Sequence, residues 1–176
     1  SWIGWERKRG KLEALMTLLT GGGSAFLDFG ARSQPEAGTP YVVTLDSDTL
    51  LPPGALRELV GVAAHPLNRP RLGAAPAGAL RVVSGHGILQ PRLLPAWPSV
   101  GAGSLYYRLF SGATAGHDAY NAVASEVYQD LLGEGSFSGK GLLDVAAVHA
   151  VLSGRLPEGQ ILSHDLEEPH FIPRSP

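Results

Sequence analysis

Apolar residues recur at helical spacing between Glu6 and Leu19, which predicts an amphipathic helix with one buried face. The apolar positions of this face are Leu12, Leu15, Met16 and Leu19. Consecutive glycines, Gly21 to Gly23, follow directly and are typical of the end of a helix. The pattern therefore places a first buried surface near the start of the chain.

The first half of this predicted helix is basic. Lys8, Arg9 and Lys11 lie where the helix dipole disfavours cations. This conflict is explained if the side chains face a bound anion. Taken alone, an ordinary solvated surface is the simpler explanation.

The most informative pattern is Y-V-V-T-L-D-S-D-T, from Tyr41 to Thr49. A strand over residues 41–45 runs directly into two carboxylates, Asp46 and Asp48. In open α/β sheets, ligands bind at the edge where such strands end. Hard oxygen ligands there suit Mg²⁺ or Mn²⁺ shared with a substrate phosphate. The alternative is a solvated turn, since Asp and Ser are ordinary turn residues.

Beyond this strand, the pattern predicts a second helix and two short strands. Pro52-Pro53 suits a first helical turn and His65-Pro66 a stop, and the expected buried face consists of Leu56, Leu59, Val60 and Ala63. Residues 66–79 are rich in Pro, Ala and Arg and predict a loop, as do residues 30–40. Strands are expected at Leu80–Val83 and Gly87–Gln90, and Ser84-Gly85 suits a hairpin turn between them.

The remainder alternates between irregular and helical patterns. Residues 91–103 should be irregular, whereas 104–111 and 117–131 suit helices. A glycine-rich segment runs from Gly133 to Gly141. Asp144 can cap a helix from Val145 to Leu152, which Gly154 would close. Neither an internal repeat nor a domain boundary is visible.

Composition restricts the classes of function. The chain has 176 residues, 44% of them hydrophobic, which is enough for one domain with a real core. A net charge of −2 gives no electrostatic case for nucleic acid or an acidic membrane surface. The absence of cysteine excludes disulfides, zinc–thiolate sites and cysteine nucleophiles. No apolar run is long enough to span a bilayer.

Several catalytic motifs fail on inspection. A phosphate loop around Lys140 fails because Glu134 replaces its first glycine and Gly141 its Ser or Thr. A serine-hydrolase elbow fails because Phe137 occupies the nucleophile position. A calcium loop fails because Leu50 and Leu51 follow the Asp pair. The six histidines lack zinc-protease spacing.

Two further features stay open at this point. The glycine-rich segment could let its backbone approach a sugar closely, or it could be a plain tight turn. Asp165 follows His164 just after an apolar pair, Ile161-Leu162. Such a carboxylate could be a general base or a helix N-cap.

Read together, the blocks of the chain resemble one family. They are G-W-E-R-K-R-G-K-L-E-A-L, Y-V-V-T-L-D-S-D-T, A-H-P-L-N-R-P, G-I-L-Q-P-R, Y-Q-D-L-L-G-E-G-S-F-S-G-K-G and I-L-S-H-D-L. In this order they are similar to the glycosyltransferase domain of cyclic β-1,2-glucan synthases, glycosyltransferase family 84. The resemblance extends from Trp2 to about Glu168. The long glycine-rich block is specific to it, whereas a D-x-D pair alone would not be.

The resemblance implies a fold and a reaction. The fold would be α/β and GT-A-like, a nucleotide-diphospho-sugar transferase sheet flanked by helices and incomplete here. The donor would be UDP-glucose, the acceptor a growing β-1,2-glucan, and the cofactor Mg²⁺ or Mn²⁺. The donor is α-linked and the product β-linked, so a single inversion with one general base is sufficient.

The same resemblance assigns residues to roles. Asp48 would hold the metal and the donor diphosphate, Asp46 would contact the nucleotide or the metal shell, and Lys11 would also contact the donor. Asp165 would be the general base. The acceptor would lie against Gln90, Ser138, Gly139, Lys140 and His164, although for His164 a structural hydrogen bond is an equal alternative.

The resemblance also predicts the place of this segment in a larger protein. Residues 1–168 would be the central part of a glycosyltransferase domain, and residues 169–176, which depart from the family, an irregular tail. The strands that grip uridine are expected upstream of Ser1, in the remaining domains of the same polypeptide. The intact synthase is expected at the cytoplasmic face of the bacterial inner membrane.

Two functions are therefore compared. The first is the core of an inverting β-glucosyltransferase. The alternative is a non-catalytic remnant that binds a sugar nucleotide or glycan. For the 176 residues alone we expect weak or no binding of UDP-glucose and no turnover. A carbohydrate-cleaving enzyme is disfavoured, because no opposed pair of carboxylates stands out.

Overall fold

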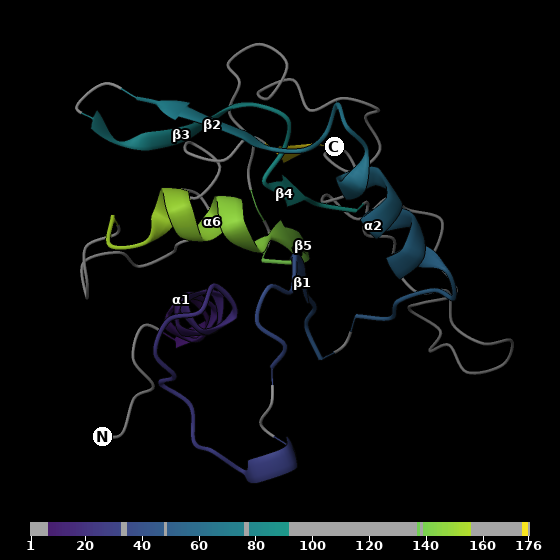
Figure 1. Ribbon diagram of the computed structural model, residues 1–176. Coiled ribbons are helices and arrows are strands. Elements are labelled where there is room, and N and C mark those ends of the chain that lie inside the picture. The colour runs from purple at the N-terminus through teal and green to yellow at the C-terminus, as the bar shows by residue number, and fades with distance from the viewer. Residues whose placement is uncertain are drawn as a thin grey trace, which may run out of the picture.

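The computed structural model describes residues 7–32, 35–47, 49–75, 78–91, 137, 139–155 and 174–175. Helices and strands are mixed in this part of the chain, as the α/β prediction requires (Figure 1). They are arranged around a small sheet that combines segments from both ends of the sequence.

This sheet has four short strands in the order β1-β5-β4-β6. β5 (Gly141–Asp144) pairs antiparallel with β1 (Tyr41–Thr44) on one side and with β4 (Ile88–Leu89) on the other. β6 (Arg174–Ser175) extends the sheet by pairing parallel to β4. The predicted strand at 41–45 is thus confirmed as β1, and its partner is a segment about one hundred residues away in sequence.

The two faces of the sheet are buried by different helices. Side chains alternate along a strand, so the register aligns Val42, Leu143 and Ile88 on one face. That face packs against α1 (Arg7–Leu19) and α6 (Val145–Leu152). The opposite face, with Leu142 and Leu89, packs against α2 (Ala55–Ala64). The result is a sheet held between helices (Figure 1).

The first helix agrees with its prediction. Met16 and Leu19 are buried, and Leu15 packs against the same cluster. The helix ends at Leu19, and Gly21 has a φ of 89°, a left-handed conformation that glycine adopts without strain. The loop at 30–40 contains one short 3₁₀ turn, η1 (Gly30–Arg32).

The second helix begins later than the proline signal indicated, at Ala55 after Gly54. Ala63 is buried, and Leu59 and Val60 pack on the sheet. Leu56, however, is 46% exposed, so its assignment to the buried face was wrong. The reason is that α2 packs on the sheet through its later residues Leu59, Val60 and Ala63, so that Leu56 in the first turn has no buried cluster beside it.

The predicted loop at 66–79 and the predicted hairpin at Ser84-Gly85 were both wrong. β2 (Arg71–Ala74) lies within the supposed loop and pairs antiparallel with β3 (Leu80–Ser84), forming a separate two-stranded sheet. β3 and β4 therefore belong to different sheets. Gly85, with a φ of 75°, carries the chain between them, and a Cβ at this position would collide with the Arg69 carbonyl.

The capping prediction for the last helix is confirmed. The Asp144 Oδ1 accepts a hydrogen bond of 2.9 Å from the Ala147 amide, at the start of α6. Ser153 follows the helix, and Gly154 has a φ of 68°. The helices expected at 104–111 and 117–131, and nearly all of the irregular stretch at 91–103, lie outside the described residues. Among the helices that are described, none has the length and apolar character needed to cross a membrane.

Candidate functional site

The antiparallel pairing of β1 with β5 brings two predicted site segments together. Thr44, the last residue of β1, pairs with Gly141, the first residue of β5. If this register is continued past the paired residues, Asp46 comes opposite Gly139. The D-x-D segment and the glycine-rich segment therefore meet at one end of the sheet, and sheet pairing is the cause.

Two lysines converge on the Asp46 carboxylate. The Lys140 Nζ lies 2.9 Å from Oδ2, and the Lys8 Nζ lies 3.2 Å from Oδ1. The Lys8 ammonium also donates a hydrogen bond of 2.7 Å to the carbonyl of Gly139. We refer to Lys8, Asp46, Gly139 and Lys140 as the Asp46 cluster. It joins the first turn of α1 to the segments that flank β1 and β5.

The lysines determine the electrostatics of this cluster. Hydrogen bonds from Lys140 and then from Lys8 hold the pKa of the Asp46 carboxyl below its ordinary value. The side chains of Asp46 and Lys8 are 43% and 49% exposed, so a ligand can reach them from solvent. The two ammonium groups are hydrogen-bond donors to which an oxyanion could also bind.

A pocket of about 340 Å³ lies beside the cluster. This volume is within the range of about 300 to 1,000 Å³ that is common for small-molecule sites. Lys140 lines it together with Gln90, the residue predicted to contact the acceptor. The other walls come from the loop after β1, from α2 and from β4 with the residues that follow it, and they are Leu45, Thr49, Leu50, Leu51, Pro52, Ala55, Glu58, Leu59, Val62, Leu89 and Pro91.

The structure thus brings together four of the predicted site residues, namely Asp46, Gln90, Gly139 and Lys140. Asp48, Ser138, His164 and Asp165 lie outside the described residues. Lys11 is exposed on α1, and its assignment to the donor stays a prediction.

Lys8 is the functional candidate that the sequence assignment missed. The basic start of α1 was noted, but the donor role went to Lys11, one helical turn further along. The three basic side chains, Lys8, Arg9 and Lys11, differ in their surroundings. Lys8 reaches Asp46, while Arg9 is buried and forms an ion pair of 3.0 Å with Glu13. Helical periodicity does not make this choice, since Lys8 and Lys11 both lie at helical spacing from Leu15, which packs against the core.

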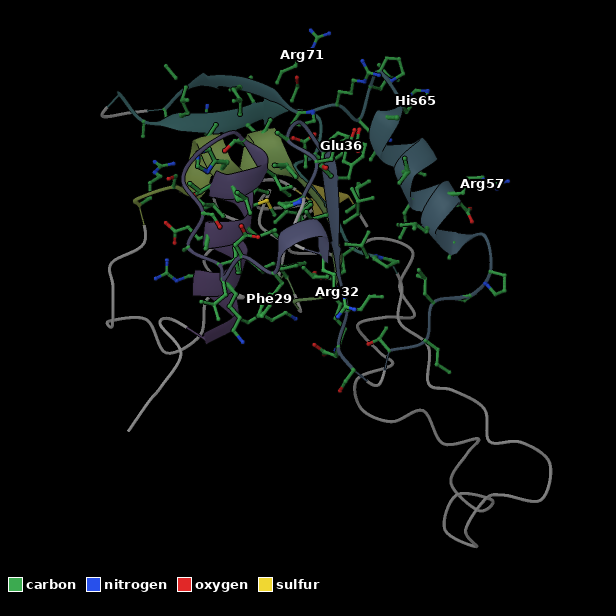
Figure 2. All side chains as sticks on the ribbon, turned by 60° about the horizontal axis from the view of Figure 1, so that its bottom comes forward. Phe29, Arg32, Glu36, Arg57, His65 and Arg71 are labelled. Carbon is green, nitrogen blue, oxygen red and sulfur yellow. The ribbon has the colours of Figure 1, made fainter. Side chains whose placement is uncertain are left out.

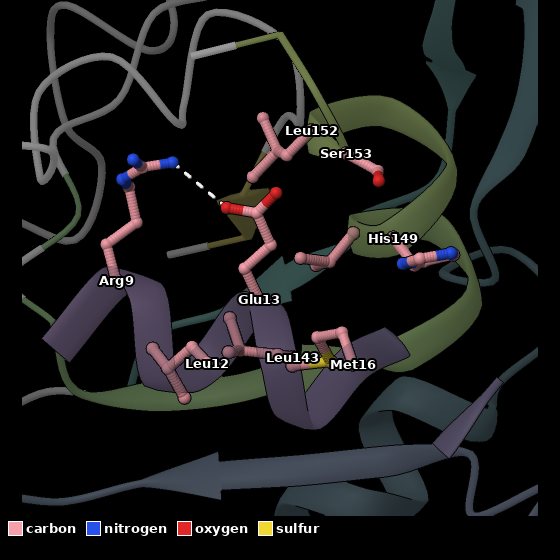
Figure 3. A pocket seen from close by; sticks show the side chains of 9 residues that line it. Arg9, Leu12, Glu13, Met16, Leu143, His149, Leu152 and Ser153 are labelled. Atoms are coloured by element: carbon pink, nitrogen blue, oxygen red, sulfur yellow. Dashed lines mark hydrogen bonds and ion pairs between the residues drawn. The ribbon is translucent and has the colours of Figure 1, made fainter. Parts of the chain in front are cut away.

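A second cavity lies between α1 and α6 and belongs to the packing of these helices. Its volume is about 40 Å³, and it is lined by apolar side chains such as Met16 and Leu143. Arg9 and Glu13 face each other at its edge (Figure 3). The cavity is too small for a sugar nucleotide, so we do not include it in the functional site.

The residues that could hold a metal are few in the described part of the chain. There, no group of three or more His, Asp or Glu side chains is close enough to bind an ion. Asp46 offers two hard oxygens, but each already accepts from a lysine.

Known proteins show what the chain is similar to. No family model matches the chain. Over 167 residues, which is 95% of its length, the chain is 46% identical to the cyclic beta-(1,2)-glucan synthase NdvB of Rhizobium meliloti (strain 1021). The chain is therefore similar to a segment of a cyclic β-1,2-glucan synthase. The resemblance inferred from the sequence blocks is confirmed.

The match covers only a small part of NdvB. The chain covers 6% of the length of NdvB. The chain thus corresponds to a small segment of NdvB.

Proposed function

We propose that this chain is part of the catalytic core of an inverting β-glucosyltransferase with a GT-A-like fold. In the intact synthase it would transfer glucose from UDP-glucose to a growing β-1,2-glucan. The observation that carries this proposal is the meeting of Asp46 with Gly139 and Lys140 beside the pocket that contains Gln90. The similarity to NdvB supports the same conclusion.

The donor would bind at the Asp46 cluster. Its diphosphate would accept hydrogen bonds from Lys8 and Lys140, because ammonium groups are strong donors to phosphate oxygens. Asp46, with Asp48, would hold Mg²⁺ or Mn²⁺. When bound, this ion supplies Lewis-acid stabilisation of the leaving UDP. Lys11 remains a further candidate contact to the donor.

The acceptor would lie in the neighbouring pocket. Gln90 and Lys140 line it, and Ser138, Gly139 and His164 are the other proposed contacts. Asp165 would accept the proton of the attacking hydroxyl as oxygen bonds to the anomeric carbon and the bond to UDP breaks. A single base is sufficient because the configuration inverts once.

The remaining domains of the polypeptide would complete the site. We propose that they supply the uridine-binding strands and place the synthase at the cytoplasmic face of the bacterial inner membrane. The coverage of 6% of NdvB leaves room for both.

The proposal is tested in the intact synthase that contains this segment. We expect Asp165→Asn and Asp46→Asn each to lower glucan synthesis by about 100-fold or more, the scale typical of lost transition-state stabilisation. Glu36→Gln is a matched control, since Glu36 is an exposed acid on the loop before β1 (Figure 2). Activity near that of the control in Asp165→Asn rejects the base assignment.

A non-catalytic remnant that binds a sugar nucleotide or glycan is the second candidate. It is favoured by one observation, that both oxygens of Asp46 are already engaged by lysines. Isothermal titration of the 176 residues with UDP-glucose and Mn²⁺ separates the two functions. A remnant with real affinity releases heat, whereas the core of a larger synthase binds weakly by itself. Robust glucose transfer by this chain alone would contradict both descriptions.

A further inference from the structure

The two-stranded sheet of β2 and β3 has an inner face toward α6 and an outer face. Val82 of β3 is buried in the same cluster as residues of α6, and Leu72 is its partner across the ladder. Side chains alternate along a strand, so Gly73 and Arg81, which are also partners, lie on the outer face. A Cβ on Gly73 would come within 2.7 Å of the Val83 side chain, so Val83 belongs to the outer face too.

The outer face carries two arginines, Arg71 and Arg81. Arg71 lies two positions before Gly73 and therefore on the same face, where it is a diagonal neighbour of Arg81. Both side chains are exposed, and neither forms an ion pair with a residue that the structure describes. Figure 2 shows Arg71 at the rim of the molecule. The sequence has no acidic residue between Glu58 and Asp118, so β2, β3 and their connection contain nothing that neutralises these charges.

β2 also has an outer edge, on the side away from β3. The Ala75 amide donates a hydrogen bond of 2.6 Å to the Ala79 carbonyl, so these residues form a hydrogen-bonded pair of the ladder. Hydrogen-bonded and non-hydrogen-bonded pairs alternate between antiparallel strands. The backbone groups of Ala74 and Leu72 therefore point away from β3. In the part of the chain that the structure describes, no donor or acceptor is bonded to them.

The corresponding edge of β3 is occupied at one point. The Arg155 guanidinium, just after α6, donates a hydrogen bond of 2.9 Å to the Leu80 carbonyl. This contact agrees with the alternation, because Leu80 pairs with Ala74 and its carbonyl should point outward. The edge of β2 is therefore the place where a further strand can be added, since the outward groups of an edge strand are a template for pairing.

The side chains of β2 specify what an added strand would need. On the outer face, acidic residues would lie beside Arg71 and could extend over Gly73, which has no side chain, toward Arg81. On the inner face, apolar residues would cover Leu72, which is 41% exposed. An extended segment in which acidic and apolar residues alternate meets both conditions.

We propose that the edge of β2 binds an extended segment of a partner protein, in which acidic residues alternate with apolar ones, as an additional strand. Backbone hydrogen bonds with Leu72 and Ala74 provide affinity, and Arg71 and Arg81 provide the preference for acidic residues. This inference does not depend on the proposed function, because it concerns a different sheet.

Two other occupants of this edge are disfavoured. Binding to an anionic membrane surface is typical of clusters of about four to eight basic residues, whereas this face has two. A second copy of the chain would bring two more arginines to the same face, and like charges on neighbouring strands are destabilising.

The test is a titration of the ¹⁵N-labelled 176-residue chain with a short, end-blocked peptide in which glutamate and valine alternate. At about four times the Kd of the peptide, hydrogen exchange of the Leu72 and Ala74 amides should slow by about fivefold, because only the unbound chain exchanges them freely. The Gly73 amide, which points toward β3, should change little. A peptide in which lysine replaces glutamate should leave all three amides unchanged.

Variants of the chain identify the contacts. Ala74→Pro removes an outward N–H but keeps the pairing with β3, since proline is tolerated where an edge strand faces solvent. It should weaken peptide binding by about tenfold or more. Arg71→Gln should weaken binding by about two- to fivefold. Arg57→Gln removes the same charge from the outer side of α2 and should have no effect (Figure 2). Preserved amide signals of β2 and β3 show that each variant is folded.

Several results would overturn the inference. They are a lack of protection of Leu72 and Ala74 by the acidic peptide, equal protection by the lysine peptide, and equal binding by Arg71→Gln and the unmodified chain. Protection that rises with chain concentration without peptide would assign the edge to a second copy. Protection by anionic phospholipid vesicles but not by the peptide would assign it to a membrane surface. Either result would also overturn the proposed partner.

Discussion

Asp46 lies at the point where β1 leaves the sheet, and its surroundings are cationic. Lys8 and Lys140 come from opposite ends of the described sequence and meet on one carboxylate. The sequence indicated the basic start of α1 and Lys140 as separate candidates, but it did not indicate that Lys8 and Lys140 pair with Asp46. The partners of a charged side chain depend on tertiary contacts, and sequence periodicity does not contain them.

The pKa of Asp46 provides a test at this scale. The hydrogen bonds of Lys140 and Lys8 lower it from the ordinary value, so Lys140→Gln should raise it toward that value. A lowered pKa in the folded state means that the ion pairs stabilise the fold above the unfolded pKa. This contribution is lost as pH falls through the folded pKa. The pH dependence of the Asp46 carboxyl ¹³C shift measures the change, and an identical titration in Lys140→Gln would contradict the assigned cause.

Asp144 has the opposite shift and gives a second test. Burial raises its pKa, and the amides of Ala147 and Ala146 partly offset this effect. Its contribution to stability is therefore largest at pH below the unfolded pKa and decreases as pH rises through the folded pKa. Asp144→Ala should lower the free energy of unfolding by about 1 kcal/mol through loss of the cap. Asp144→Asn keeps an acceptor and should change it by less at neutral pH.

Chemical denaturation at several pH values measures both Asp144 variants. The stability difference between the unmodified chain and Asp144→Asn should shift in favour of the unmodified chain as pH falls. A difference that stays constant with pH would show that the Asp144 carboxyl does not titrate abnormally.

At the scale of elements, local patterns predicted helices better than strand partners. α1 and α6 were predicted almost to their observed ends, because periodicity, a cap and glycines all act within a few residues. β2 was missed because its sequence, R-L-G-A, has no β-branched residue. Its strand conformation depends on pairing with β3, and the partner of β3 could not be read from the short loop at Ser84-Gly85.

Gly85 is the position where this error can be tested. A hairpin turn would also allow a left-handed φ at Gly85, but the close approach to the Arg69 carbonyl belongs to the observed passage from one sheet to the other. Gly85→Ala should lower the free energy of unfolding by about 3 kcal/mol. Gly61→Ala is the control, since Gly61 is exposed within α2 and has open space around it, and there alanine should stabilise by about 0.5 to 1 kcal/mol.

Thermal or urea unfolding measures the free energy of unfolding of the two glycine variants. Equal small effects would mean that Gly85 lies in a relaxed turn, as the predicted hairpin would have allowed.

At the scale of the whole molecule, the sheet is the reason that the site exists. β5 lies between β1 and β4, so segments near residues 46, 90 and 140 come to the same end of the sheet. The sequence blocks predicted these segments as site regions through resemblance, and the similarity to NdvB confirms that resemblance. Their meeting could not be derived from the sequence, because antiparallel pairing over about one hundred residues leaves no local signal.

The end of β5 next to the site is sensitive to its packing. A Cβ on Gly141 would come within 2.6 Å of the Leu89 carbonyl oxygen, so only glycine allows this approach of β5 to β4. Gly141→Ala should therefore separate Lys140 from Gln90 and destabilise the fold by about 1 to 3 kcal/mol. Unfolding in denaturant measures the loss, and an unchanged midpoint would contradict the described packing.

The central claim is that the Asp46 cluster binds the diphosphate of a sugar nucleotide. Its most direct test is a titration of the ¹⁵N-labelled chain with UDP and Mg²⁺, with each amide signal followed by NMR. The account predicts weak binding, with shift changes concentrated at residues 44–47, 139–141 and the start of α1. Shift changes that concentrate in another part of the chain would contradict it.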